Sequence, residues 1–423
     1  MSPRFSVLTT VFDPEPEHLV ACLASVAGQT GPDVEHIVVD DASTRADVRA
    51  VLDELADTAR RTIIRRPENG GIVAASNDAL SAASGEFVVL VDHDDVLAAG
   101  ALATLDAALD DDPDIEVAYT DHDLLRPDGR CTSPVYKPDF SLERLRNHNY
   151  ITHLVVARRT LVTEVGGFRA GTDGAQDHDL LLRLAERVGH FHHLPAILLH
   201  WRQSPASVAS DVANKPAAFD REVDVVAAHL DRCGIPADVE PGEYPGIVRI
   251  RRHLVGRPTV SVIVPTCGSR ARVWGVERVL VHDAVASVLI DADLDGRYEL
   301  EIVAVVDRGT DAVVERGLRR LAGERLRTVD YPGPFNFADK INVGVSASRG
   351  DYVLVLNDDT ELIAAGSVAE MVGLAQQDDV GMVGAKLLFG DGTLQHGGHL
   401  YLSLIHISEP TRPSKSSRMP SSA

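Results

Sequence analysis

Hydrophobic and polar positions alternate in blocks along the first part of the chain. Apolar runs typical of strands cover 5–11, 34–39, 62–64 and 87–91, and polar or acidic residues follow each run. Between the first two runs, apolar residues recur at helical spacing over 16–27, and this stretch begins with a proline, as helices often do. Strands that alternate with helices predict an α/β fold built on a mostly parallel sheet.

The last of these runs leads into a group of acidic residues. Residues 87–91 are apolar without a break, which is typical of a strand buried on both faces. Asp92, Asp94 and Asp95 follow at once, at the end of the strand where open α/β folds bind ligands. Three carboxylates this close repel one another unless a cation neutralises them, and carboxylate oxygens suit Mg²⁺ or Mn²⁺. We therefore favour a metal site over a solvated acidic turn.

A second acidic pair, Asp40 and Asp41, ends the run 34–39. The carboxyl ends of parallel strands meet at one edge of a sheet, so this pair should converge on the first acidic group. The structural alternative is a turn or helix cap that continues through Ser43 and Thr44.

Length and charge limit the possible partners. The chain has 423 residues, which predicts two domains, and 41 Lys and Arg against 63 Asp and Glu give a net charge of −22. This charge argues against nucleic acid as a partner. The four cysteines form no CxxC pair, which is consistent with a reducing compartment. There is no apolar run near the roughly 18 residues of a membrane span and no signal-peptide pattern, while peripheral membrane contact stays open.

Seven short pieces, in order and at matching spacing, resemble glycosyltransferase family 2. They cover about the first 210 residues: Ser6–Thr10, Ser25–Thr30, Val39–Ser43, Asp92–Asp95, Gly166–Phe168, Gln176–Leu180 and His193–Arg202. The resemblance implies the GT-A fold, which binds a nucleotide sugar, and a reaction that inverts the anomeric centre.

The resemblance also implies roles for individual residues. A nucleotide sugar would contact Thr10, Asp13, Asp40, Asp41, Asn77, Asp92 and Asp95. A divalent cation, Mn²⁺ or Mg²⁺, would be held by Asp92, Asp94 and His200, because imidazole is a reasonable ligand beside carboxylates. His200 follows an apolar stretch and could equally be a core or surface histidine.

Asp177 is the candidate general base, since inverting transfer needs a carboxylate to deprotonate the acceptor hydroxyl. It lies near the start of a predicted helix, where the dipole favours negative charge. Gln176 stands where many relatives carry Glu, so the familiar Glu-Asp pair is absent. The alternative makes Asp177 and Asp179 ordinary first-turn carboxylates above a leucine core.

The first part of the chain then repeats. The runs 260–266, 301–307 and 350–360 match the earlier strands, and Asn342 falls where Asn77 did. Only weak equivalents of the site residues remain in this copy: Asp307, Asp358 and Asp359. The short sequences at 335–340 and 395–398 resemble sequences found in tandem transferases that build bacterial surface polysaccharides.

We expect four segments: a GT-A domain at 1–235, a linker at 236–258, an incomplete second GT-A copy at 259–402 and a disordered tail at 403–423. The tail is polar and without periodicity. Its first part looks like translated sequencing adapter, so the natural chain is expected to continue differently, and a genuine flexible tail is the alternative. The second copy should leave apolar side chains of 353–356 and 387–389 exposed.

The resulting hypothesis is a metal-dependent, inverting glycosyltransferase. It would move a sugar from a nucleotide diphosphate sugar to a glycan or lipid-linked acceptor during synthesis of bacterial cell-surface polysaccharide. A nucleotidyltransferase is one alternative, although residues 9–13 lack the Gly-rich, basic phosphate loop that such enzymes usually need. A non-catalytic binding module is another, above all for the second copy. We expect a cytoplasmic location, with the inner face of the cell membrane open for peripheral association.

Overall fold

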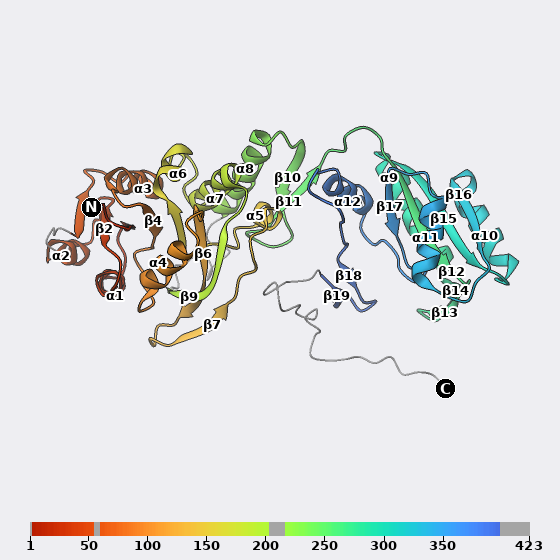
Figure 1. Ribbon diagram of the computed structural model, residues 1–423, viewed down its shortest axis with the longest axis horizontal. Coiled ribbons are helices and arrows are strands. Elements are labelled where there is room, and N and C mark those ends of the chain that lie inside the picture. The colour runs from red at the N-terminus through yellow and green to blue at the C-terminus, as the bar shows by residue number, and fades with distance from the viewer. Residues whose placement is uncertain (1, 55–59, 203–215, 398–423) are drawn as a thin grey trace. The chain divides into compact units, whose positions relative to one another are not determined.

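The computed structural model describes residues 2–54, 60–202 and 216–397. These residues form two compact units, each with its own sheet, and the units divide in sequence between Ile250 and Arg251 (Figure 1). Strands and helices alternate along most of the chain. The fold is therefore mixed α/β, as the apolar runs predict.

The first unit is built on one large sheet in the order β3–β2–β1–β4–β8–β6–β9–β5, with β7 paired to β6. Its strands are β1 (Phe5–Val11), β2 (Val34–Asp40), β3 (Arg61–Arg65), β4 (Phe87–Leu90), β5 (Val96–Leu97), β6 (Val117–Leu125), β7 (Cys131–Val135), β8 (Val155–Arg158) and β9 (His192–Arg202). Its helices are α1 (Pro16–Ala27), α2 (Ala46–Glu54), α3 (Gly71–Ala82), α4 (Ala101–Asp111), α5 (Leu142–Asn147), α6 (Arg159–Glu164), α7 (Gln176–Val188) and α8 (Pro216–Arg232).

Strand direction changes across this sheet. β3, β2, β1 and β4 run parallel, so their carboxyl ends share one edge. β8 is antiparallel to both β4 and β6, whereas β9 runs parallel to β6. The parallel half therefore brings the ends of β1, β2 and β4 together, as expected from the sequence.

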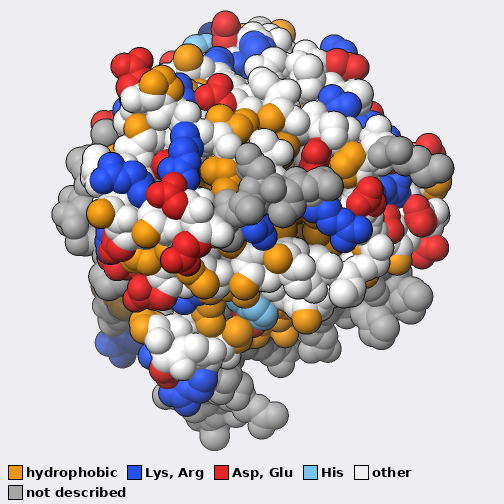
Figure 2. Space-filling model, turned by 90° about the vertical axis from the view of Figure 1, so that its left-hand side faces the viewer, with side chains coloured by type: hydrophobic (Ala, Val, Ile, Leu, Met, Phe, Trp, Pro, Cys, Tyr) orange, Lys and Arg blue, Asp and Glu red, His pale blue; other side chains and the backbone are white. Residues whose placement is uncertain are grey.

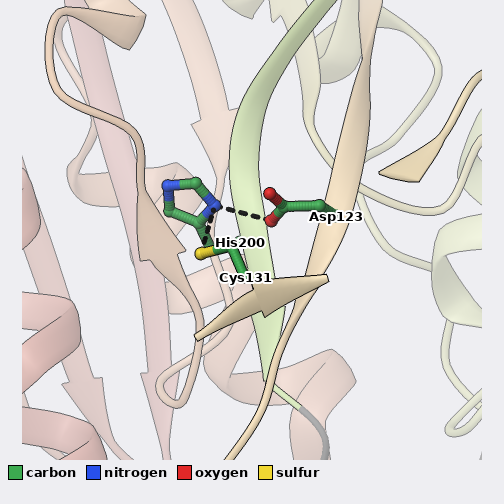
Figure 3. A group of neighbouring side chains, drawn as sticks. All are labelled: Asp123, Cys131 and His200. Atoms are coloured by element: carbon green, nitrogen blue, oxygen red, sulfur yellow. Dashed lines mark hydrogen bonds and ion pairs between the residues drawn. The ribbon is translucent and has the colours of Figure 1, made fainter. Parts of the chain in front are cut away.

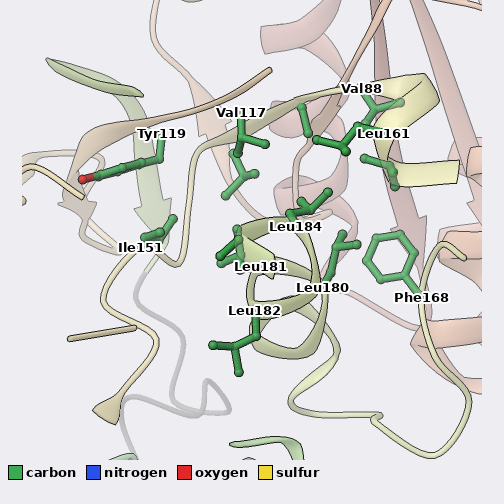
Figure 4. Packing of buried hydrophobic residues seen from close by; sticks show 14 of the residues in the cluster. Val88, Val117, Tyr119, Ile151, Leu161, Phe168, Leu180, Leu181, Leu182 and Leu184 are labelled. Atoms are coloured by element: carbon green, nitrogen blue, oxygen red, sulfur yellow. The ribbon is translucent and has the colours of Figure 1, made fainter. Parts of the chain in front are cut away.

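Both faces of the sheet are covered, which explains the unbroken apolar runs. On β1, Val7 packs with residues of α1 and α4, while Leu8 belongs to the cluster formed with α3 and α7. In that second cluster, Leu180, Leu181 and Leu184 of α7 are fully buried (Figure 4). The leucine face of α7 is thus part of the core. Its packing fixes the orientation of the helix and therefore the position of its first turn.

The expected linker at 236–258 contains a hairpin, β10 (Ala237–Pro241) and β11 (Val248–Arg252). Val248 is buried in the same cluster as the leucines of α7, and Ile250 packs against this cluster. The first half of the stretch therefore belongs to the first unit. Apolar side chains at alternate positions of β11 are the reason, because they need a core to cover them.

The second unit contains a parallel sheet in the order β16–β15–β12–β17, which repeats the order β3–β2–β1–β4. Its strands are β12 (Thr259–Thr266), β13 (Arg270–Val273), β14 (Val276–Val279), β15 (Glu299–Asp307), β16 (Leu326–Tyr331), β17 (Tyr352–Val355), β18 (Leu387–Leu388) and β19 (Leu394–His396). Its helices are α9 (Leu280–Asp295), α10 (Ala312–Ala322), α11 (Phe337–Ala347) and α12 (Ser367–Ala375), with a 3₁₀ turn at Gly323–Arg325.

Apolar exposure in this unit follows the sequence prediction at most positions. Val353, Val355, Leu387 and Phe389 are between 38% and 46% exposed, whereas Leu356 is buried. The predicted disordered tail at 403–423 lies outside the described residues. Among the residues that are described, no helix combines the length and apolar character needed to cross a membrane.

Candidate active site

The ends of β1 and β2 meet in a network of loop hydrogen bonds. Asp13 accepts hydrogen bonds from the backbone N–H groups of Thr44 and Arg45, at 2.8 and 2.9 Å, and from the Thr44 hydroxyl at 2.6 Å. Burial acts to raise the pKa of Asp13, but these hydrogen bonds outweigh it and hold that pKa below its ordinary value. Thr10, at the end of β1, contacts the His93 ring through its backbone carbonyl at 3.0 Å. Asp13 therefore ties the two strand ends together.

Asp40 and Asp41 are both buried, and protein donors reach each of them. Asp40 accepts a hydrogen bond from the Ser43 backbone at 2.9 Å. Asp41 accepts from the Arg66 guanidinium at 2.7 Å and from the N–H groups of Gly70 and Gly71 at 2.9 Å. Asp40 therefore stabilises the turn that follows β2, as the structural alternative predicts. Asp41 holds the loop that begins α3, whether or not it also meets a ligand.

Asn77, another predicted ligand contact, has a clear structural role in the described chain. Its amide nitrogen donates to the Phe168 carbonyl at 2.8 Å, and its amide oxygen accepts from the Phe168 N–H at 2.9 Å. A Cβ on Gly167 would lie 2.6 Å from that oxygen, and Gly167 has φ +65°. Asn77 therefore fixes the Gly-Gly-Phe loop, and glycine is required there to let the amide approach.

Three possible metal ligands gather where β4 ends: Asp92, Asp95 and His153. One ligand atom from each lies within 4.8 Å of the other two, and His153 Nε2 is 3.7 Å from Asp92 Oδ2. Asp95 is fully buried, and its Oδ1 accepts a hydrogen bond from the Arg202 N–H at 2.9 Å. Its Oδ2 is buried and has no hydrogen-bond partner among the described residues. An unpartnered buried carboxylate oxygen is costly unless a cation or a proton meets it.

The charge state of Asp95 reflects this environment. Burial raises its pKa well above the ordinary value, and the negative charges of Asp92 and Asp94 raise it further. Only the Arg202 hydrogen bond and charge oppose this. A divalent cation would reverse the balance, because it stabilises the ionised form of every carboxylate around it. The donor set of two carboxylates and one imidazole fits Mn²⁺ or Mg²⁺.

The predicted ligand set of Asp92, Asp94 and His200 is not assembled in the structure. Asp94 is fixed through its backbone carbonyl, which accepts from Arg202 Nε at 2.7 Å. His200 lies instead against Asp123, with 2.6 Å between Nδ1 and Oδ1. The cause is strand register, because β9 pairs with β6 so that His200 is opposite Asp123. The imidazole beside Asp92 belongs to His153, which the sequence did not single out.

Lys137 explains why His153 lies where it does. Its ammonium is buried and donates to three backbone carbonyls, those of Thr120, Ile151 and His153. Burial lowers the pKa of Lys137 to about 7, against the opposing charge of Asp121. One side chain therefore fastens the segment before β8 to β6. No local sequence signal marks this role, because the three carbonyls come from distant positions.

Asp177, the candidate base, occupies the first turn of α7. Its Oδ2 accepts a hydrogen bond from Asn149 Nδ2 at 2.8 Å, and Asn149 Oδ1 accepts from the Thr152 N–H at 3.1 Å. Thr152 precedes His153, so the segment 149–153 connects the candidate base to the candidate metal ligands. Asp179 is buried and forms ion pairs with Arg169 and Arg183. It is therefore a structural carboxylate of the first helical turn, which was the alternative considered for both residues.

Glu222 on α8 is a further acidic residue near Asp177. Burial raises the pKa of Glu222 to about 7, and the charge of Asp177 contributes to the same shift. The helical pattern over 217–230 predicts the helix but gives no sign that this carboxyl faces the site. A second carboxyl beside the base offers a group whose protonation changes near neutral pH.

We expect Glu222→Gln to stabilise the protein at pH 8 more than at pH 5. The folded pKa of Glu222 lies above the unfolded one, so the folded state binds more protons between about pH 4.5 and pH 7. Wild-type stability therefore falls as the pH rises through this window, and glutamine removes that loss. Melting temperatures of both proteins at the two pH values test this. Asp224→Asn, an exposed position on the same helix, is the control, and an equal Glu222→Gln effect at both pH values would contradict the assignment.

The equivalent edge of the second unit carries a lysine. Lys340 on α11 is fully buried, with its Nζ 2.8 Å from Asp307 Oδ1 and 3.1 Å from the Thr266 carbonyl oxygen. Asp358 accepts a hydrogen bond from the Thr266 hydroxyl at 2.7 Å. With Asn342 aligned to Asn77, Lys340 takes the position of Ala75. A built-in cation thus neutralises Asp307, and Asp359 is the remaining predicted ligand of this unit.

The chain is similar to a known protein family and to curated proteins along most of its length. The model described as Glycosyl transferase family 2 matches residues 6–155 and 261–418. The "Uncharacterized protein y4gI" of Sinorhizobium fredii is 36% identical over 403 residues, which cover 94% of this chain and 43% of that protein. The "O-antigen biosynthesis protein RfbC" of Myxococcus xanthus is 34% identical over 401 residues, or 94% of this chain and 30% of that protein. The chain thus spans less than half the length of these relatives.

Similarity to solved structures is weaker. S. aureus TarS 1-349 in complex with UDP-GlcNAc is 20% identical, with a TM-score of 0.44 over 54% of this chain and 66% of that chain. A mannosyltransferase from Pyrobaculum calidifontis, in complex with GDP-Man and Mn²⁺, is 23% identical with a TM-score of 0.41, over 55% of this chain and 64% of that chain. The family model, by contrast, matches most of both units. The chain belongs to glycosyl transferase family 2.

Proposed function

We propose that the first unit is an inverting, metal-dependent glycosyltransferase that uses a nucleotide diphosphate sugar. The observation that carries this proposal is the buried Asp95 carboxylate, whose Oδ2 has no hydrogen-bond partner among the described residues, beside Asp92 and His153. A carboxylate held in this state is prepared for a cation. Its place at the end of β4, on the edge shared with β1 and β2, is where open α/β sheets bind nucleotides.

The donor would bind along the edge formed by the ends of β1, β2 and β4. Asp13 and Asp41 hold the loops of this edge in place, and the Thr10 backbone carbonyl contacts the His93 ring. Asp40 and Asp41 are the candidates to accept a hydrogen bond from the base, with Asp92 and Asp95 near the ribose and diphosphate. The network makes the edge rigid before the donor arrives, which lowers the entropic cost of binding.

Asp92, Asp95 and His153 would hold the divalent cation, with Asp94 next to them in the loop. When bound, this ion offsets the negative charge that develops on the departing nucleotide diphosphate. Asp177 accepts the proton of the acceptor hydroxyl as that oxygen attacks the anomeric carbon. Asn149 orients Asp177 through one hydrogen bond and leaves its Oδ1 for the acceptor.

The acceptor is proposed to be a glycan or a lipid-linked saccharide. A curated relative that aligns with most of this chain is named for O-antigen biosynthesis, and "Chondroitin synthase" of Pasteurella multocida is 31% identical over 183 residues, or 43% of this chain and 18% of that protein.

All four cysteines are free, which supports a reducing compartment such as the cytoplasm. Lys and Arg side chains are interspersed with Asp and Glu on the face in Figure 2, so this face offers no basic surface for nucleic acid.

For the second unit we propose a binding role without transfer. Lys340 neutralises Asp307 and contacts the Thr266 carbonyl, at the ends of the two strands that correspond to β2 and β1. Asn357 and Thr360 stand where the first unit has Asp92 and Asp95, so this copy lacks two of the carboxylates proposed to hold a cation. The unit would therefore bind a saccharide or nucleotide without activating it.

A donor screen on the full chain tests the proposed function. The purified protein is incubated with Mn²⁺ and a panel of uridine, guanosine and deoxythymidine diphosphate sugars, with and without oligosaccharide acceptors, and released nucleoside diphosphate is measured. We expect release with one donor class and an increase when the acceptor is present. Release of pyrophosphate from a nucleoside triphosphate and a sugar phosphate, without diphosphate release from any donor, would instead identify a nucleotidyltransferase.

A further inference from the structure

A second group of ligand-type side chains lies on the sheet of the first unit and shares no residue with the Asp92 cluster. Asp123 of β6, Cys131 of β7 and His200 of β9 point toward one another (Figure 3). His200 Nδ1 is 2.6 Å from Asp123 Oδ1 and 3.3 Å from Cys131 Sγ. One ligand atom from each side chain lies within 4.8 Å of the other two.

Strand register explains this arrangement. In the parallel pair β6 and β9, Asp123 is opposite His200, and in the antiparallel pair β6 and β7, Leu125 is opposite Cys131. Residues two apart on a strand share a face, so Asp123 and Leu125 lie on the same side of β6. Cys131 is therefore a diagonal neighbour of Asp123. Three hydrogen-bonded strands hold the three donors, so the group is fixed by the sheet rather than by loops.

The geometry does not suit a nucleophilic triad. In such a triad the nucleophile and the carboxylate contact different ring nitrogens of the histidine. Here Cys131 and Asp123 both contact Nδ1 of His200, and the other ring nitrogen points away from them (Figure 3). Three donors converging on one point is the pattern of a chelate.

Another group of ligand-type side chains in the unit differs from this one because arginine side chains contact it. Glu186, His229 and Cys233 also lie close together, but Arg232 pairs with Glu186 at 2.7 Å and Arg146 donates to the His229 ring at 3.0 Å. Guanidinium groups thus already provide positive charge there. Within the described ranges, the one basic side chain that contacts the Asp123 carboxylate is His200 itself.

We propose that Asp123, Cys131 and His200 bind one Zn²⁺ ion. Thiolate, imidazole and carboxylate are the ligands that zinc prefers, whereas the two carboxylates and one imidazole of the Asp92 cluster suit Mn²⁺ or Mg²⁺. Tetrahedral zinc separates a sulfur and a nitrogen ligand by about 3.5 Å, and a nitrogen and an oxygen ligand by about 3.3 Å. The thiol is already near that spacing, and the carboxylate has to withdraw by less than about 1 Å. Three protein ligands leave a fourth position for water or an external donor.

Cobalt binding tests this proposal on the full chain without a histidine tag. After EDTA treatment and dialysis, Co²⁺ is titrated in as a spectroscopic substitute for zinc, and thiolate-to-cobalt charge-transfer absorption is recorded. We expect one thiolate-bound Co²⁺ per chain, displaced by one equivalent of Zn²⁺. Cys131→Ser should abolish the charge-transfer band, and Asp123→Asn should weaken Zn²⁺ binding by roughly tenfold or more.

Matched variants identify the site and separate it from the proposed transfer function. Cys233→Ser tests the other cysteine cluster, and Asp92→Asn tests the predicted donor metal site; both should keep the band. Zinc should also raise the melting temperature of the wild type but not of Cys131→Ser, because a ligand that binds only the folded state stabilises it. No band in the wild type, or a band that survives Cys131→Ser, would overturn the proposal, and so would loss of the band in Cys233→Ser or Asp92→Asn.

Discussion

Asp177→Asn is expected to lower sugar transfer by about 10²- to 10⁴-fold while leaving donor binding intact. Asparagine keeps an oxygen that can accept the hydrogen bond from Asn149 Nδ2, so the side chain stays oriented. What it loses is the ability to take the acceptor proton. The leucine face of α7 is buried and is not altered by the change, so the fold should remain the same.

Turnover and nucleotide affinity, measured separately, test this role. Initial rates of nucleotide release are compared with the dissociation constant of the nucleoside diphosphate from calorimetry in the presence of Mn²⁺. Asp231→Asn, an exposed position near the end of α8, provides the control for charge removal. An Asp177→Asn protein that loses nucleotide binding but turns over each bound donor at the wild-type rate would show that Asp177 is not the base.

Asp95→Asn should abolish metal-dependent transfer and at the same time stabilise the metal-free protein. Asparagine still accepts the hydrogen bond from the Arg202 N–H, but it cannot provide a negative charge to a cation. We expect a loss larger than the roughly 10- to 100-fold effect of removing a group that only orients a metal ligand. Activity and stability should therefore change in opposite directions.

The stability gain follows from linkage. Burial, together with Asp92 and Asp94, raises the folded pKa of Asp95 above its unfolded value of about 4. The folded state then binds the extra proton above about pH 4, so wild-type stability falls as the pH rises through the window up to the folded pKa. Asparagine does not ionise, so the stability of the variant does not fall in this way as the pH rises. In EDTA at pH 7 the variant should melt at a higher temperature than the wild type, and a lower melting temperature would refute the assignment.

The parallel half of the first sheet was predictable because its signals are local. Residues 87–91 form an unbroken apolar run that ends at Asp92, and the structure places β4 there, beside β1. Asp40 likewise ends β2 on the same edge. Each of these inferences needed only a short stretch of sequence and the rule that parallel strands share their carboxyl edge.

The ligand partners could not be predicted in the same way, because they depend on register and on long-range contacts. His200 follows an apolar run as Asp92 does, but the pairing of β9 with β6 places it beside Asp123. His153 reaches Asp92 because Lys137 fastens its backbone, and that contact joins strand β6 to a distant loop. Asn77 contacts Phe168 across 91 residues. Such contacts leave no periodic pattern in the sequence.

The dependence of nucleotide release on metal is the most direct test of the proposed active site. Release from the accepted donor is followed with the wild-type chain in Mn²⁺, after EDTA, and after Mn²⁺ is restored, with His153→Ala measured in parallel. We predict that release stops in EDTA and returns with Mn²⁺, and that His153→Ala needs a higher Mn²⁺ concentration for half-maximal activity. Full release in EDTA would contradict a metal site formed by Asp92, Asp95 and His153.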